Sequence, residues 1–105
     1  MKIAVTYADG QVYQHFGHAA QFKLYTIESG MILDTAVVDA TASGHSAMVS
    51  YLQRQGVNTV ICGGIGGGAV SALAGAGIRL FAGATGSADQ AVLALLAGKL
   101  VHNPE

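Results

Sequence analysis

Several residue types are scarce in this chain of 105 residues, and each scarcity excludes a class of protein. There is no tryptophan, and the one cysteine rules out a disulfide within the chain, which fits a reducing compartment such as the cytoplasm. Charged residues make up 10% of the chain, and its five lysines and arginines form no cluster. The sequence therefore predicts no basic surface for nucleic acid.

A membrane span is not expected either, although 51% of the residues are hydrophobic and the mean hydropathy is +0.46. The longest stretch without a charge, residues 55–78, contains polar residues and a glycine triplet that would interrupt a spanning helix. No signal peptide is expected, because a strand-like segment follows Met1 directly. We expect one α/β domain over residues 1–105.

The apolar pattern predicts five strands and three helices. The strands are expected at residues 2–7, 22–28, 31–38, 59–62 and 78–82, and the helices at about 46–55, between the glycines and residue 77, and at 87–98. Residues 8–20, 39–44 and 83–86 are expected to be loops, and Ser29-Gly30 a hairpin turn. Ser87 and Gln90 match a capping box at the start of the third helix. The element order β-β-β-α-β-α-β-α favours a mixed five-stranded sheet in the order 3-2-1-4-5, with strand 2 antiparallel and helices on both faces.

The chain is organised around Val57 to Gly77, in which five of the six residues from Gly63 to Gly68 are glycine. A strand, a bare-backbone loop and a helix N-terminus can together hold an anion through main-chain amides, here those of Gly64, Gly66 and Gly67. A tight turn that packs the helix on the sheet explains the glycines equally well. The P-loop lysine is missing, and no acidic residue completes a dinucleotide fingerprint.

The candidate metal ligands are the one cysteine and three of the four histidines. Cys62 ends the strand before the glycines, so it is either a buried core thiol or an exposed thiol with a lowered pKa. His15 and His18 lie in the first loop, and His45 precedes the first helix. No carboxylate pair or catalytic triad is evident, so the pattern gives little support for an acid–base enzyme.

The chain resembles the dinitrogenase iron–molybdenum cofactor biosynthesis family, which includes NifX/NafY-like proteins and NifB C-terminal domains. The resemblance is carried by the His15-Phe16-Gly17-His18 box and the Val60–Gly66 glycine box, and it continues to Gly98-Lys99. It implies a ribonuclease-H-like three-layer fold and a carrier rather than a catalyst. Its cargo would be an iron–molybdenum–sulfur or iron–sulfur cluster. The carrier would act in nitrogen fixation or in cluster trafficking.

By this resemblance His15 is the leading cluster ligand, and His18, His45 and Cys62 are further candidates. Cys62 falls where relatives vary. We expect a metallocluster and cluster-assembly proteins as partners, and neither nucleic acid nor membrane. Two other functions remain open: a small enzyme or binding module for a phosphorylated metabolite or nucleotide held by the glycine loops, and a structural adaptor domain. Binding of a phosphate ester without metal would favour the enzyme or binding module. Binding of neither a cluster nor a phosphate ester would favour the structural adaptor.

Overall fold

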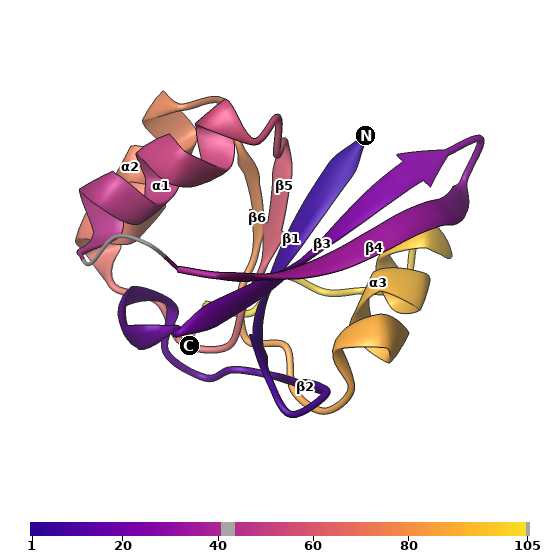
Figure 1. Ribbon diagram of the computed structural model, residues 1–105. Coiled ribbons are helices and arrows are strands. Elements are labelled where there is room, and N and C mark those ends of the chain that lie inside the picture. The colour runs from indigo at the N-terminus through magenta and orange to yellow at the C-terminus, as the bar shows by residue number, and fades with distance from the viewer. Residues whose placement is uncertain (41–43, 105) are drawn as a thin grey trace.

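A mixed β-sheet forms the middle layer of the molecule, and helices cover both of its faces (Figure 1). The structure is a computed structural model that describes residues 1–40 and 44–104. It has the predicted α/β class with a mixed sheet and three α-helices. That the fold is ribonuclease-H-like stays a prediction. Within the described residues, no helix combines the length and apolar character needed to cross a membrane.

The sheet has six strands rather than the predicted five. Its main path runs β4-β3-β1-β5-β6, and β2 pairs with β1 off this path. The β1–β3 and β3–β4 pairs are antiparallel, whereas β5 is parallel to both β1 and β6. The strands are β1 (Lys2–Ala8), β2 (Gln11–Val12), β3 (Gln21–Glu28), β4 (Met31–Asp39), β5 (Thr59–Ile61) and β6 (Arg79–Phe81).

Two tight hairpins explain the antiparallel half. Ser29 and Gly30 both have positive φ and join β3 to β4, as predicted. Asp9 and Gly10 have the same geometry and join β1 to β2. The prediction of an uninterrupted loop over residues 8–20 was therefore wrong, because a two-residue strand gives no alternation that sequence patterning can detect. A 3₁₀ turn, η1 (Phe16–His18), follows in the same segment.

The helices begin and end close to the predicted positions. They are α1 (His45–Arg54), α2 (Gly67–Gly75) and α3 (Ala88–Leu96). Ser87 accepts a hydrogen bond from the Gln90 amide at 3.2 Å, which confirms half of the predicted capping box. Gly56 and Gly77 follow α1 and α2 with positive φ. The expected loop at 39–44 includes residues 41–43, which lie outside the described residues, and β4 extends into it through Asp39.

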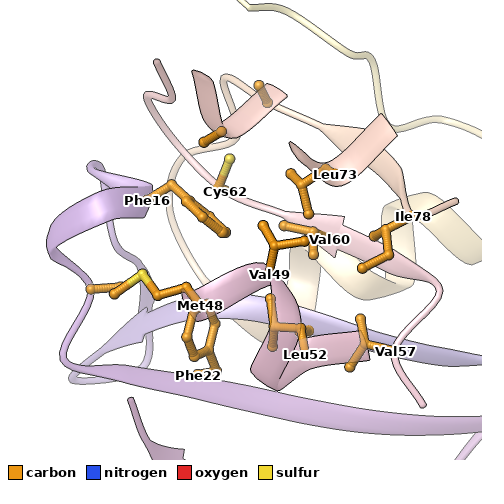
Figure 2. Close-up of a cluster of buried hydrophobic side chains, with 14 of the residues drawn as sticks. Phe16, Phe22, Met48, Val49, Leu52, Val57, Val60, Cys62, Leu73 and Ile78 are labelled. Carbon is orange, nitrogen blue, oxygen red and sulfur yellow. The ribbon is translucent and has the colours of Figure 1, made fainter. Parts of the chain in front are cut away.

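Two separate cores lie on the two faces of the sheet. Alternation along β1 sends Ala4 to the face covered by α1 and α2, and Ile3 and Val5 to the face covered by α3. Figure 2 shows the first core, where side chains from η1, β3, α1, β5 and α2 meet. Its labelled members are Phe16, Phe22, Met48, Val49, Leu52, Val57, Val60, Cys62, Leu73 and Ile78. The first core therefore ties η1 to the helices that flank the glycine loop.

Candidate functional site

A cavity of about 400 Å³ opens at the edge of the first core, beside the carboxyl ends of β1 and β5. Three segments line it: η1 with the residue before it, the start of α1, and the glycine loop leading into α2. The lining residues are His15, Phe16, Gly17, His18, Gly44, His45, Gly64, Ile65, Gly66, Gly68 and Ala69. A cavity at strand carboxyl ends is the position at which open α/β sheets bind ligands.

Main-chain hydrogen bonds attach the His15 segment to the glycine loop. The Gly64 amide donates to the Gln14 carbonyl at 2.6 Å, and the Phe16 amide donates to the Gly64 carbonyl at 3.0 Å. These bonds form an isolated parallel bridge between His15 and Gly64. A Cβ on Gly63 would lie 2.6 Å from the Gln14 Cα, so only glycine permits this approach. The glycines thus position His15, a role that the sequence alone did not reveal.

The Gln14 side chain fixes the same segment from its other side. Its amide nitrogen donates to the Val12 carbonyl at 3.0 Å and to the Ala84 carbonyl at 3.1 Å. Phe16, which is buried, points into the first core beside Met48 (Figure 2). His15 therefore sits between an anchored glutamine and an anchored phenylalanine while its own ring is exposed. The anchored neighbours hold the backbone of His15 in a fixed position, which a side chain that binds a ligand requires.

The three predicted histidines all line the cavity. The His15 and His18 rings are 6.4 Å apart between centroids, at an interplanar angle of 78°. His45 comes from the first residue of α1 and lies over the start of α2. A Cβ on Gly68 would be 2.9 Å from the His45 ring carbon Cε1. Gly68 is thus a site residue that sequence analysis missed, because a glycine run does not show which member faces a side chain.

The N-terminus of α2 supplies hydrogen-bond donors to this region. Gly66 is the N-cap residue, and no side chain among the described residues caps the helix. The amides of Gly67, Gly68 and Ala69 in its first turn have no intrahelical partner, and they carry the positive end of the helix dipole. Gly64 and Gly66 line the cavity as predicted, while Gly67 is next to the lining residues. Of the predicted loops, 83–86 contributes no described residue to the lining.

Cys62 lies in the first core, fully buried among apolar side chains (Figure 2). Burial raises the pKa of its thiol to about 12. The alternative of an exposed thiol with a lowered pKa is therefore wrong, although the neighbouring helix N-terminus favoured it. The backbone turns only after Cys62, so the side chain still follows the inward alternation of β5. The structure thus favours a core thiol over a metal ligand.

The geometry suits a ligand larger than one metal ion. Among residues 1–40 and 44–104, no three His, Cys, Asp or Glu side chains are gathered closely enough to hold a single ion. The described lining contains no lysine, arginine, aspartate or glutamate. Imidazole nitrogens can ligate metals such as iron, and free amides favour negative charge. A polynuclear anion could contact both kinds of group at once, which a bare cation could not.

The fold and cavity define a small α/β domain in which histidines and main-chain amides line the same cavity. The chain belongs to the dinitrogenase iron–molybdenum cofactor family, whose model matches residues 1–98. It is 30% identical over 105 residues to an uncharacterised protein of Methanocaldococcus jannaschii, covering 95% of this chain and 89% of that relative. The family resemblance of the two sequence boxes is thereby confirmed.

Solved structures share the whole fold. The crystal structure of PH0822 superposes with a TM-score of 0.89 at 25% identity, covering 98% of this chain and 96% of that one. The apo form of the orange protein from Desulfovibrio gigas superposes with a TM-score of 0.82 at 28% identity, covering 97% and 92%. The similarity therefore extends over both faces of the sheet.

Proposed function

We propose that this protein is a non-enzymatic carrier of an iron–molybdenum or related metal–sulfur cluster in metallocluster biosynthesis or trafficking. One observation carries the proposal: three histidines from two distant segments and the amide-bearing start of α2 line the same cavity. The family membership supports this cargo. Metal–sulfur clusters are commonly anionic, so they match both the imidazoles and the helix N-terminus.

Each group has a distinct role in this proposal. His15, anchored on both sides, is the leading metal ligand, and His18 and His45 are additional ligands. The Gly64 amide, predicted as a donor to the cluster, is already used by the Gln14 carbonyl. The amides of Gly66 and Gly67 stabilise the negative charge of the cluster, with those of Gly68 and Ala69 beside them. Few and exposed ligands suit a carrier, because the cargo must leave again. Beside its three histidines, the described lining offers no carboxylate, amine or hydroxyl side chain that could form a catalytic pair with an imidazole, which favours a carrier over an enzyme.

An anaerobic loading assay tests the proposal. Apo-protein is incubated with ferrous iron, sulfide and tetrathiomolybdate, desalted, and assayed for bound metal and its visible charge-transfer bands. We expect stoichiometric metal on the wild type and a loss of most of it in His15→Ala. His102→Ala is the matched control, because His102 is an exposed histidine outside the described lining. Equal retention by His15→Ala and wild type would contradict the ligand assignment.

The alternative functions give different results with the same protein. A phosphorylated ligand held by the glycine loop would bind without metal, and inorganic phosphate would compete with it. The absence of a lysine or arginine from the described lining counts against this class. A structural adaptor would retain neither metal nor phosphate. Binding of phosphate esters together with failure to retain any metal would replace the carrier proposal.

A further inference from the structure

A second cavity, of about 430 Å³, lies on the α3 face of the sheet and shares no lining residue with the histidine cavity. The strand β6 forms one side of it, and the last turn of α3 with the segment that follows forms the other. In Figure 1 the chain leaves α3 and crosses the sheet towards the end of β6. The volume lies within the range of roughly 300–1,000 Å³ that is usual for small-molecule sites. The lining residues that carry side chains are Met1, Arg79, Phe81, Leu95, Leu96 and Leu100.

Apolar side chains form most of this lining. Phe81, Leu95, Leu96 and Leu100 pack against the α3 core but are only half-buried. Met1 beside them is 46% exposed. A ligand that covers apolar surface of this kind gains free energy in proportion to the apolar area that it removes from water. The lining therefore suits the hydrocarbon part of a ligand.

Arg79 is the one charged side chain in the described lining, which contains no acidic residue. Within residues 1–40 and 44–104 it takes part in no ion pair. Its guanidinium carbon Cζ lies 5.3 Å from the centroid of the Phe81 ring. Stacking occupies one face of the guanidinium and leaves the N–H donors in its plane available. Such a group binds a carboxylate through two parallel hydrogen bonds, so the cavity calls for a negative charge at this position.

The main-chain groups around the cavity are largely used already. Three of the last four carbonyls of α3, those of residues 93–95, accept hydrogen bonds from amides of residues 97–99. At the end of β6, the Ala82 carbonyl accepts from the Asn103 amide at 2.8 Å, and the Ala82 amide donates to His102 Nδ1 at 3.1 Å. A peptide backbone would find few partners here, whereas a hydrocarbon chain needs none.

We propose that the second cavity binds a free aliphatic carboxylic acid of medium chain length. Its carboxylate would pair with Arg79, and its hydrocarbon chain would lie on Phe81 and the leucines. A carboxylate carries the single negative charge that one arginine can match, whereas a phosphate dianion would call for further cations. The site lies on the opposite face of the sheet from the histidines, so it does not depend on the proposed function.

Titration of the apo-protein with octanoate, followed by NMR correlation spectra of the amides, tests the proposal. We expect shifts at residues 79–81 and 94–100, with a Kd of about 0.1–1 mM. Each methylene removed should weaken binding about threefold to fourfold, so hexanoate should bind about tenfold more weakly. Octanamide has the same chain length without the charge, and it should also bind about tenfold more weakly. Shifts centred on residues 64–69, or an affinity independent of chain length, would overturn the proposal.

Arg79→Gln should lower the affinity for octanoate about tenfold and leave that for octanamide unchanged. Arg54→Gln is the matched control, because Arg54 is an exposed arginine at the end of α1, outside the described lining. His15→Ala should bind octanoate like the wild type, so a failed loading assay would leave this proposal standing. Equal octanoate affinity in Arg79→Gln and wild type would overturn it. Tighter binding of an acetylated peptide that ends in leucine would assign the cavity to a protein C-terminus and overturn the free acid as its ligand.

Discussion

The two faces of the sheet share the same strands but differ in the contacts that hold their helices. On the α3 face, Asp89 accepts a hydrogen bond from the Tyr25 hydroxyl at 2.6 Å and forms an ion pair with Lys23 at 2.9 Å. The Lys23 ammonium also lies 5.3 Å from the centroid of the Tyr25 ring. These contacts anchor α3 to β3. On the α1 and α2 face, no described ion pair is present, and the layer opens into the cavity.

The α1 and α2 face, which carries the cavity, has fewer polar contacts to stabilise it. Histidine rings and helix amides that are to hold a ligand must stay free of partners within the protein. Glycines at Gly63 and Gly64 bring segments together without adding apolar contact. Stability on that face must therefore come from the apolar side chains beneath the cavity, whereas polar contacts reinforce the α3 face. Four substitutions test this division, in order of decreasing effect.

Leu52→Ala should have the largest effect on the free energy of unfolding. Leu52 is fully buried in the first core, on the helix that begins at His45. Removing a buried leucine side chain should cost about 2–5 kcal/mol, because transfer free energy is lost and a cavity remains. Urea denaturation followed by circular dichroism measures the loss. A cost below about 1 kcal/mol would show that this core does not carry the stability of the binding face.

Gly63→Ala should destabilise the protein by about 1–3 kcal/mol, because the new methyl group collides with the Gln14 backbone. It should also reduce metal retention in the loading assay, since the His15 segment must move. Gly75→Ala is the matched control: it lies in α2, a Cβ added there would have no other group within 4 Å, and its φ is not positive. That variant should gain about 0.5–1 kcal/mol. If both variants load like wild type, the glycines do not position His15.

Cys62→Ala should keep full metal retention and lose about 1 kcal/mol of stability, because a small buried group is removed. In the folded wild type, a thiol reagent should react far more slowly than in urea. Burial and a thiol pKa raised to about 12 both suppress the reactive thiolate. The measurement is the labelling rate with and without urea. Rapid labelling of the folded protein, protected by bound metal, would restore Cys62 as a ligand.

Asp89→Asn should have the smallest effect, at most about 1 kcal/mol, because the carboxylate is 58% exposed. Hydrogen bonds from Lys23 and then Tyr25 hold the pKa of Asp89 below its ordinary value. A carboxyl with a lowered folded pKa stabilises the protein above its unfolded pKa, about 3.9, and this contribution is lost as the pH falls through the folded pKa. The difference between wild type and variant should therefore be present at about pH 7 and disappear at acidic pH in urea titrations. A difference that is independent of pH would exclude the ion pair as its source.

Most of the fold could be predicted because its signals are local. Alternation in residues 2–7, the Ser29-Gly30 turn and the Ser87 cap each specify their own element. The strand β2 was missed because its pairing depends on one turn, Asp9-Gly10, and two residues. The cysteine was harder to assign, since the same sequence position suits both a core thiol and a ligand. Only the packing around Cys62 distinguishes the two.

The sequence indicated which histidines belong to the candidate site, but not the contacts that hold them in place. Histidines and glycines are conspicuous in the sequence, so His15, His18 and His45 could be proposed together. That Gly68 lies beneath the His45 ring, and that Gln14 anchors the His15 segment, depends on contacts between distant parts of the chain. Such contacts leave no periodic pattern in either segment. Family resemblance supplied the cargo class, which neither spacing nor charge could specify.

The bridge between His15 and Gly64 has a consequence for the order of events in the cell. It joins segments that are far apart in the sequence, so closing it carries a large entropic cost that other contacts must first offset. A nascent or partly folded chain therefore has its histidines but no assembled site. Cargo would be accepted only by molecules that have completed folding. Under the proposed function, the separation of the two segments in the sequence would prevent loading before the chain has folded.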